Sequence, residues 1–590
     1  MDAESDDLVM DDVMDNDSDD QDEEEEEEEE EDDDDDEDQD EQQDDDVLEA
    51  SDEDEDDTKT KLKKDAVRHK KDMEELKKRD PEFYQYLQKE DAELLNFDMS
   101  EEEEEEEEAG SDAQDDSDDQ ANDDQDDQDD GMFDEGELTT VTMAMLDSWV
   151  QQIEKKADIK SWRRLMAAFK TATKMNDEEE REKNTFIYKI VDPAVFNKVL
   201  TSTMHFAPIV FDHHLLKSNP SSPRKAKQWT HLQSTIKTYL NNLLYLLRSL
   251  TDVSMQYLTV QEAEKCTAYW ACFDRLPKDY LKVLLHMYSN MGSSDNVRIQ
   301  SFLAIRSLAS ASHHTKRGDK DEPMLDLCLK HLYLEFVRTC KNTNAHTLPS
   351  INLMRNLAVD LYGLDQVTSY QQAFVYIRQL AVHLRGAMQT RSEETYKAVY
   401  NWQYVHCIDF WANVLATYCQ PTQGEDESPL TSLIYPLSQV ALGAIRLIPT
   451  AQYYPLRFHI LKSLASLSKA SKVFITLVPY LLDVLNSAEL LNKAKPSTVK
   501  ALDWDVTLRT PKSHLHGRVY QDGIIDQIVE TLDLCMQPFY HELSFPEMAI
   551  PVIVAVKRFI KKSNNVKGNN KLLKLVHKVN LGDRALFFLT

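Results

Sequence analysis

Glycine is scarce in this sequence, with 13 residues among 590. Phosphate-binding loops and dinucleotide-binding turns need closely spaced glycines, because glycine lets the backbone approach phosphates and adopt left-handed conformations. Neither a Walker-type nor a dinucleotide fingerprint occurs, and no serine stands in the setting of a hydrolase nucleophile. The sequence therefore gives little support to an enzyme, and we expect a protein without a cofactor or a small-molecule substrate.

Cysteine is also rare, with seven residues, an odd number, and no Cys–x2–Cys pair. This pattern does not indicate a disulfide framework and favours a reducing compartment. The best candidate for a metal site is Cys328 with His331 and Cys340. Zinc requires four converging ligands, so we interpret these residues as core positions of an ordinary helix and expect no metal.

A long apolar run is missing too. The segment Met548–Val556 is apolar but contains a proline, and it is much shorter than the roughly 18 residues of a membrane-spanning helix. The N-terminal "MDAESDDLVM" lacks the basic and apolar regions of a signal peptide. We therefore expect a soluble, intracellular protein with no membrane partner.

Charge is abundant and unevenly distributed. Residues 1–137 hold 71 acidic and 11 basic residues, a net charge of −60, whereas residues 138–590 hold 40 acidic and 54 basic residues, a net charge of +14. The first part cannot bury enough apolar surface to offset its ordering entropy. We predict a disordered acidic tail over 1–57 and a disordered acidic linker over 101–137. The remaining 453 residues exceed one ordinary core, which favours a repeat array or several domains.

A basic stretch opens the segment 58–100, which separates the two acidic parts. Ten Lys and Arg residues lie between Lys59 and Arg79. Such a cluster is typical of a nuclear-import address or a nucleic-acid patch. A solvated helix is the alternative, because Glu74 and Glu75 lie at helical spacing from Lys78 and Arg79. The nuclear-address candidates are Lys61, Lys63, Lys64, Arg68, Lys70, Lys71, Lys77, Lys78 and Arg79.

Large apolar side chains follow the basic stretch, although acidic tracts flank them. Asp80 suits a helix N-cap and Pro81 the first helical position, and the apolar residues after them form a stripe at helical spacing. A helix this short is marginal alone in water. We predict a recognition motif that folds into a groove on a partner or on this chain's own helical body; a hydrophobic cluster without a receptor is the alternative. The motif comprises Asp80, Pro81, Phe83, Tyr84, Tyr86, Leu87, Leu94 and Phe97.

Helical periodicity dominates the chain from residue 138 onward. In residues 234–250 the apolar residues fall on one helix face, and four further stretches behave alike: 351–364, 374–388, 405–419 and 458–485. Prolines mark the breaks between them, and no convincing alternating strand pattern occurs. We predict an all-α fold over 138–590, an α-solenoid of HEAT or armadillo type. A large irregular helical domain is the alternative, because no crisp repeat motif is visible.

Basic residues without any acidic neighbour fill the segment 550–581. Several recur three or four residues apart, which places them in ridges on helices. Polyphosphate backbones attract such ridges by counterion release, whereas a solvated helix face is the alternative. No aromatic residue interleaves between Lys561 and Lys578, so base stacking is not indicated. The candidate RNA contacts are Lys557, Arg558, Lys561, Lys562, Lys567, Lys571, Lys574 and Lys578.

Several segments together resemble the nucleolar complex protein 2 family. The first is "DPEFYQYLQKEDAELLNF" (80–97), and the closest is "LIYPLSQVALGAIRLIPTAQYYPLRFHILKSLASLSKAS" (433–471). The others are "SFLAIRSLA" (301–309), "NLMRNLAVDLYG" (352–363), "TPKSHLHGRVYQDGIIDQIVE" (510–530) and "FPEMAIPVIVAVKRFIKKS" (545–563). Members of this family often continue where this chain ends, at Thr590, so a terminal element is expected to be missing or divergent.

This resemblance implies a non-enzymatic assembly factor for the large (60S) ribosomal subunit. It implies heterodimers with sister nucleolar complex proteins and association with pre-60S particle proteins and pre-rRNA. It also implies a place in the nucleus and nucleolus, with the nucleoplasm as a further location. An alternative from another class is a histone or chromatin chaperone, or a nuclear regulatory binding protein. It would use Glu23–Glu31 and Glu101–Glu108 to shield basic proteins.

Overall fold

The computed structural model describes residues in six ranges: 139–174, 186–216, 223–311, 323–421, 427–496 and 499–587. The chain divides into two units, Met1–Asp134 and Glu135–Thr590, and every described residue belongs to the second. The predicted acidic tail over 1–57, the basic and recognition segment over 58–100 and the acidic linker over 101–137 lie outside the described residues. They stay predictions.

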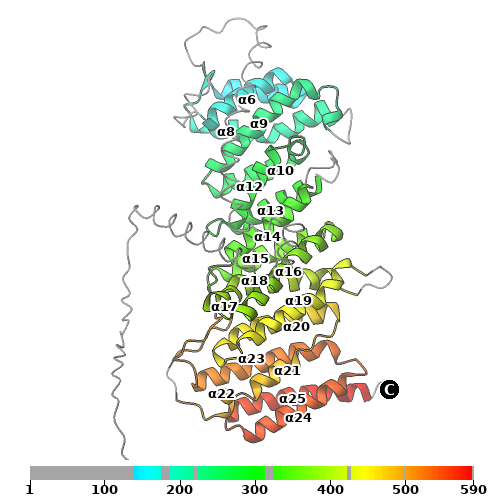
Figure 1. The fold of residues 1–590 in the computed structure, drawn as a ribbon. Helices are drawn as coiled ribbons and strands as arrows, with labels where there is room; N and C mark the ends of the chain where they lie inside the picture. Colours follow the sequence, from blue (N-terminus) through cyan, green and yellow to red (C-terminus); the bar gives the residue numbers. More distant parts are fainter. Residues whose placement is uncertain are drawn as a thin grey trace, which may run out of the picture. The chain divides into compact units, whose positions relative to one another are not determined.

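Helices form nearly all of the first part of the second unit (Figure 1). Helix α6 packs against α5, α8 and α9, and α9 packs against α12. The α-helices are α5 (Met143–Lys156), α6 (Ile159–Lys174), α8 (Pro193–Phe211), α9 (Trp229–Ser249), α10 (Val253–Lys265), α11 (Thr267–Trp270), α12 (Leu276–Ser289) and α13 (Asp295–Ala311). A π-helical turn, η1 (Asp212–Leu216), and a 3-10 turn, η2 (Pro223–Lys225), lie between α8 and α9.

The later helices continue the row in chain order. The α-helices are α14 (Met324–Thr339), α15 (Leu348–Leu361), α16 (Gln366–Thr390), α17 (Glu393–Val399), α18 (Trp402–Tyr418), α19 (Ile434–Leu447), α20 (Tyr454–Ser471), α21 (Val478–Leu485), α22 (Ala488–Leu491), α23 (Arg518–Met536), α24 (Phe545–Lys562) and α25 (Val566–Phe587). Three 3-10 turns, η4 (Pro429–Leu433), η5 (Ala451–Tyr453) and η6 (Gln537–Phe539), join some of them.

Packing between near neighbours in the chain builds the core. The most extensive helix pairs are α18 with α20, α12 with α13, α10 with α13, and α20 with α23. Figure 1 shows the helices succeeding one another from α6 at one end to α24 and α25 at the other. The all-α prediction for this part of the chain is confirmed. The assignment to HEAT- or armadillo-type repeats stays a prediction.

One short strand pair departs from the expected absence of strands. Strand β1 (Thr139–Thr140) pairs in parallel with β2 (Tyr188–Lys189), with Thr139 opposite Tyr188. The Val141 amide extends the pair by donating to the Lys189 carbonyl at 3.0 Å. Two residues per strand are too few to leave an alternating pattern in the sequence, which explains why periodicity did not reveal them.

Proline marks helix starts, as the sequence predicted, but not at every position. Pro277, Pro349 and Pro546 lie in the first turns of α12, α15 and α24, where the missing N–H costs nothing. Pro208 and Pro551 instead lie inside α8 and α24. Pro208 removes one intrahelical hydrogen bond, and the π-helical turn η1 begins four residues later, at Asp212.

The predicted helical stretch 458–485 is not continuous. It ends as α20 at Ser471, Lys472 adopts a left-handed conformation with φ of 56°, and the chain runs without helix to the start of α21 at Val478. Residues 473–476 are Val, Phe, Ile and Thr, side chains that pack poorly in a helix and well in extended backbone. The expectation of unbroken helix was therefore wrong at 472–477.

Helix α19 belongs to a segment that is as long and as apolar as a membrane-spanning helix. The segment Pro429–Leu447 has 19 residues and a mean hydropathy of 1.2, which pass a test of length and composition for crossing a membrane. In the fold α19 packs against α16, α18 and α20, and its apolar face is buried there. This packing accounts for its hydropathy as that of a core helix.

A buried histidine of α18 contacts the segment that precedes α15. His406 is 6% exposed, its ring stacks on Trp402 with centroids 5.3 Å apart, and its Nε2 lies 3.1 Å from the Thr343 hydroxyl. Burial lowers the pKa of His406 to about 4, against a smaller opposing effect of the Asp409 carboxylate. The imidazole is therefore neutral in the folded protein at neutral pH.

This depressed pKa predicts acid sensitivity. Between pH 6.5 and 4 the unfolded chain binds a proton at His406 that the folded chain does not, so the free energy of unfolding falls as the pH drops through this window. From pH 7 to 5 the loss from this residue is about 2 kcal/mol. Denaturant titrations at pH 7, 6 and 5 should show a weaker pH dependence in His406→Gln than in the wild type. An unchanged slope would contradict the prediction, and the exposed His577→Gln serves as control.

Candidate nucleic-acid interface

The eight predicted RNA contacts lie on the last two helices. Lys557, Arg558, Lys561 and Lys562 occupy the C-terminal half of α24, where cations complement the helix dipole. The other four lie along α25, and the two helices pack side by side. Seven of the eight side chains are exposed, and Lys571 is partly buried. The predicted placement of these residues on helices is confirmed.

Aspartates of α23 neutralise three of the four α25 lysines. Lys578 pairs with Asp533 at 2.7 Å, Lys567 with Asp522 at 3.8 Å, and Lys571 with Asp526. The offset between partners is 45 residues in the two pairs that also form hydrogen bonds, so α23 and α25 run parallel with matched helical registers. Pairs as exposed as these stabilise the fold little, but they cancel charge along this side of α25.

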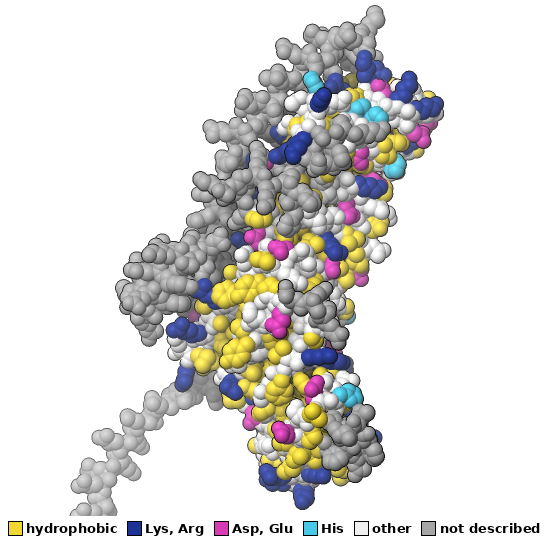
Figure 2. All heavy atoms as spheres, turned by 90° about the vertical axis from the view of Figure 1, so that its right-hand side faces the viewer, with side chains coloured by type: hydrophobic (Ala, Val, Ile, Leu, Met, Phe, Trp, Pro, Cys, Tyr) yellow, Lys and Arg dark blue, Asp and Glu magenta, His cyan; other side chains and the backbone are white. Residues whose placement is uncertain are grey.

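The α24 cations differ from those of α25. Among the described residues, Lys557, Arg558, Lys561 and Lys562 have no ion pair to an acidic side chain, and neither has Lys574. In Figure 2, Lys and Arg side chains gather at the lower end of the face shown, the height at which Figure 1 draws α24 and α25. Of the eight candidate contacts, the four on the end of α24 and Lys574 therefore keep their charge uncompensated by the described residues.

The exposed face of α24 carries apolar side chains ahead of its cations, after an exposed Glu547 in the first turn. Ile550 is 55% exposed and Val554 is 47% exposed. They continue in helical register into Lys557 and Lys561, with spacings of four, three and four residues. This face thus combines an apolar part, which suits contact with protein, and a cationic part, which suits contact with phosphate.

Sequence reasoning missed the acidic row that faces α25. Asp522, Asp526 and Asp533 stand at spacings of four and seven residues, the same spacings as Lys567, Lys571 and Lys578. This equality was the signal that could have predicted two helices in register with their charges paired. The lysine spacing alone did not distinguish a phosphate-binding ridge from an internal ion-pair row.

The cysteines are part of the core. All seven are free and buried. Burial raises the pKa of Cys328, Cys407 and Cys535 to about 12 in each case, so these thiols stay protonated and are poor nucleophiles at neutral pH. Cys328 and Cys340 are fully buried, as the core interpretation predicted, but His331 is exposed, so that interpretation was wrong for the histidine. Within the described ranges no three His, Cys, Asp or Glu side chains converge to hold a metal ion.

Two groups of predicted site residues lie outside the described residues. They are the nuclear-address candidates between Lys61 and Arg79 and the recognition motif from Asp80 to Phe97. Their roles stay predictions.

Comparison with known proteins gives consistent matches. A family model described as the Noc2p family matches residues 323–584. An uncharacterized NOC2 family protein of Schizosaccharomyces pombe is 34% identical over 518 residues, which cover 87% of this chain and 69% of that protein. Nucleolar complex protein 2 of Drosophila melanogaster is 34% identical over 546 residues, with the same two shares. Nucleolar complex-associated protein 2 of Arabidopsis thaliana is 29% identical over 518 residues, covering 86% of this chain and 65% of that protein.

These matches agree with the resemblance found in the sequence. The family model spans the described helices from α14 to most of α25, including the basic half of α24. The pairwise alignments extend over most of the chain at identities that chance does not produce over such lengths. The chain therefore belongs to the Noc2p family.

Proposed function

We propose that the protein is a non-enzymatic scaffold of a nucleolar complex that acts in assembly of the large ribosomal subunit. Family membership carries this proposal, because relatives that align with most of this chain bear the names nucleolar complex protein 2 and nucleolar complex-associated protein 2. A row of packed helices supports it, since such arrays present extended binding surfaces. The protein then works by holding partners in place.

The partners in this proposal are sister nucleolar complex proteins, proteins of the pre-60S particle, and pre-rRNA. The protein acts in the nucleolus, reached by way of the basic segment Lys61–Arg79. The motif Asp80–Phe97 serves as a partner-binding helix in this scheme. The apolar part of the α24 face, with Ile550 and Val554 exposed, offers a further surface for protein contact.

Charge-driven RNA contact is assigned to the end of α24. Its four cations are exposed and have no ion pair among the described residues, whereas three α25 lysines already face aspartates. Binding to phosphate releases counterions only where the cation is not already neutralised. The α24 set therefore contributes more to RNA affinity than the α25 set does.

Neutralising the α24 set is expected to weaken RNA binding. In the full-length protein, the variant Lys557→Gln, Arg558→Gln, Lys561→Gln and Lys562→Gln should lose at least about tenfold affinity for a structured RNA near 100 mM salt. Each lost phosphate contact lowers the slope of log K against log salt by about 1. Fluorescence anisotropy titrations at four salt concentrations measure both quantities.

The matched control neutralises lysines that are already paired. Lys567→Gln with Lys571→Gln and Lys578→Gln removes three charges from the neighbouring helix, and the salt slope should change by less than about 1 in total. Equal losses in both variants, or an unchanged slope in the α24 variant, would refute the assignment. Thermal unfolding confirms that both variants remain folded.

The alternative of a histone chaperone depends on the acidic tracts Glu23–Glu31 and Glu101–Glu108. These tracts lie outside the described residues, and no contact among the described residues favours that function over the scaffold.

A further inference from the structure

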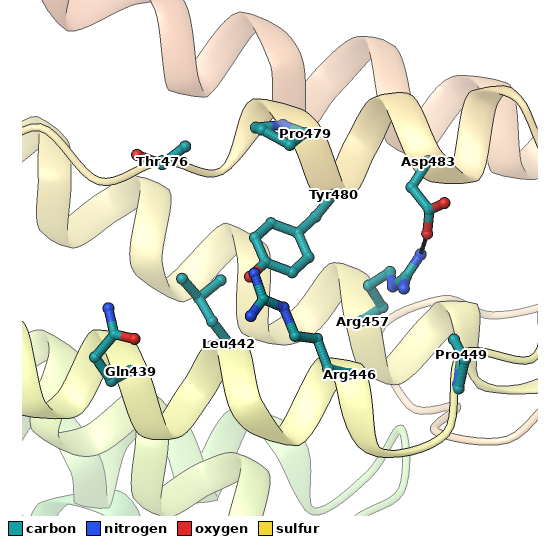
Figure 3. Close-up of a pocket in the computed structure, with 9 residues that line it drawn as sticks. All are labelled: Gln439, Leu442, Arg446, Pro449, Arg457, Thr476, Pro479, Tyr480 and Asp483. Atoms are coloured by element: carbon teal, nitrogen blue, oxygen red, sulfur yellow. Dashed lines mark hydrogen bonds and ion pairs between the residues drawn. The ribbon is translucent and has the colours of Figure 1, made fainter.

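A groove opens where α20 ends and the chain turns toward α21. Helix α19 forms one wall, and the non-helical residues before α21 together with α21 itself form the other (Figure 3). Its volume is about 540 Å³, within the range of small-ligand sites. The left-handed Lys472 redirects the chain here, so the break that periodicity did not predict creates one wall of the groove.

The lining is largely apolar. Leu442 and Pro449 contribute from the α19 side, and Pro479 and Tyr480 from the α21 side. The two prolines add no backbone N–H donor. Figure 3 shows the Tyr480 ring projecting into the space between the two walls. A ligand here therefore gains most from an aliphatic or aromatic group placed against these side chains.

Two guanidinium groups give the groove its charge. Arg457 is 5% exposed, and its Nη1 donates to Asp483 at 3.0 Å. Arg446 is exposed, and its guanidinium lies over the Tyr480 ring at 5.1 Å from the centroid. No ion pair joins Arg446 to an acidic side chain among the described residues. A guanidinium on a ring face keeps its in-plane N–H donors for a carboxylate.

A row of side chains on α19 extends the groove beyond its lining residues. Tyr435, Gln439, Leu442 and Arg446 fall in one helical row, with spacings of four, three and four residues. Tyr435 is 71% exposed, beyond the end of the lining residues. In Figure 2, hydrophobic side chains cover much of the middle and lower part of the face shown. A row of this length suits an extended chain with several side chains better than a single small molecule.

A peptide fits this chemistry better than RNA does. Arg446 already covers a face of the Tyr480 ring, on which a base would otherwise stack, and the other lining cation, Arg457, is paired with Asp483, so a run of phosphates finds no second cation here. One free guanidinium next to an apolar lining instead matches a carboxylate next to an apolar side chain. Charge complementarity therefore selects an acidic peptide.

We propose that this groove binds an acidic peptide segment of a partner protein. An Asp or Glu carboxylate accepts hydrogen bonds from Arg446, and a neighbouring aliphatic or aromatic side chain packs between Leu442 and Tyr480. The proposal rests on the scaffold function proposed above and adds the chemistry of one partner segment. The buried Arg457 stays paired with the exposed Asp483 when the peptide binds, and this pair joins α20 to α21.

The test uses the full-length protein and defined fluorescein-labelled peptides. The probe has alternating Glu with Leu and Phe, a second peptide has Glu with Ser only, and a third replaces Glu by Lys. Fluorescence polarisation should show saturable binding of the first peptide and at least tenfold weaker binding of the other two. Arg446→Gln, which removes the free cation, and Thr476→Trp, which fills the groove from an exposed position, should each weaken the first peptide at least tenfold.

The α24 variant provides the matched control. The substitutions at Lys557, Arg558, Lys561 and Lys562 should leave peptide affinity unchanged, and Arg446→Gln should leave the salt slope of RNA binding unchanged. The two measurements thus distinguish a failure of the proposed RNA contact from a failure of the proposed peptide binding. Thermal unfolding of Arg446→Gln and Thr476→Trp shows whether the fold persists.

Three outcomes would overturn the proposal. The first is no binding of the Glu/Leu/Phe peptide, or binding that both groove variants retain. The second is loss of RNA affinity in Arg446→Gln, which would assign the groove to nucleic acid. The third is at least tenfold tighter peptide binding after deletion of residues 79–98, which would make this chain's own acidic and aromatic segment the occupant in place of a partner.

Discussion

Replacing Trp411 with alanine is expected to lower the free energy of unfolding by about 4 kcal/mol. Trp411 is fully buried in α18 and contacts three tyrosine rings of other segments. The ring centroids lie 5.1 Å away for Tyr333 of α14, 5.3 Å for Tyr362 after α15, and 6.0 Å for Tyr376 of α16. The indole N–H also donates to the Tyr333 hydroxyl at 3.3 Å. Alanine would leave a cavity at the point where four helical segments meet.

Urea denaturation with two companion variants measures this effect. Trp411→Phe keeps an aromatic ring and should lose about half as much, because it removes fewer contacts and leaves a smaller cavity. Tyr435→Ala removes an aromatic side chain that is 71% exposed and should change stability by less than about 0.5 kcal/mol. A loss below about 1 kcal/mol in Trp411→Ala would show that the cluster does not join these helices.

Periodicity predicted the helices whose apolar residues form one face. The predicted stretches 351–364 and 405–419 became α15 (Leu348–Leu361) and α18 (Trp402–Tyr418), displaced by a few residues at each end. An apolar face is a local property of the sequence, because the spacing of the apolar residues alone decides which face of the helix packs into the core. The helical class could therefore be predicted before any contact was known.

The break at Lys472 could not be predicted from that same property. The apolar residues of 458–485 keep helical spacing on both sides of it, whereas Val473, Phe474 and Ile475 turn the chain out of the helix. Competition between local β-preference and apolar spacing is decided by packing, which the sequence does not display. The groove was missed for this reason, since its walls meet only once the chain has turned.

The sequence correctly predicted that the basic residues lie on helices, but it did not reveal which of them form ion pairs. The sequence predicted basic ridges on helices, and α24 and α25 carry them. The α25 lysines face Asp522, Asp526 and Asp533 because α23 packs against α25 in parallel, a tertiary fact. Spacing places charges on a face of a helix, but only packing determines whether that face meets water, phosphate or a neighbouring aspartate.

Replacing Arg298 with methionine should cost about 3 kcal/mol of unfolding free energy, the second large effect. Arg298 lies in α13 and is 1% exposed. Its Nε donates to the Tyr288 carbonyl at the end of α12, and its Nη2 donates to the Ser350 carbonyl at the start of α15, each at 3.1 Å. Hydrogen bonds from a charged group contribute about 1.5–3 kcal/mol each, and methionine would leave both carbonyls without this buried donor.

The geometry of the guanidinium, more than its charge, carries this prediction. Lysine at position 298 offers one compact ammonium and cannot reach two carbonyls of different helices in the planar fork of arginine, so Arg298→Lys should recover little stability. The ion pair with Asp295 at 3.4 Å is a separate contribution, because that carboxylate is 71% exposed; Asp295→Asn should cost less than about 1 kcal/mol. If chemical denaturation instead shows Asp295→Asn to be as costly as Arg298→Met, the exposed ion pair, and not the two carbonyl bonds, joins α12, α13 and α15.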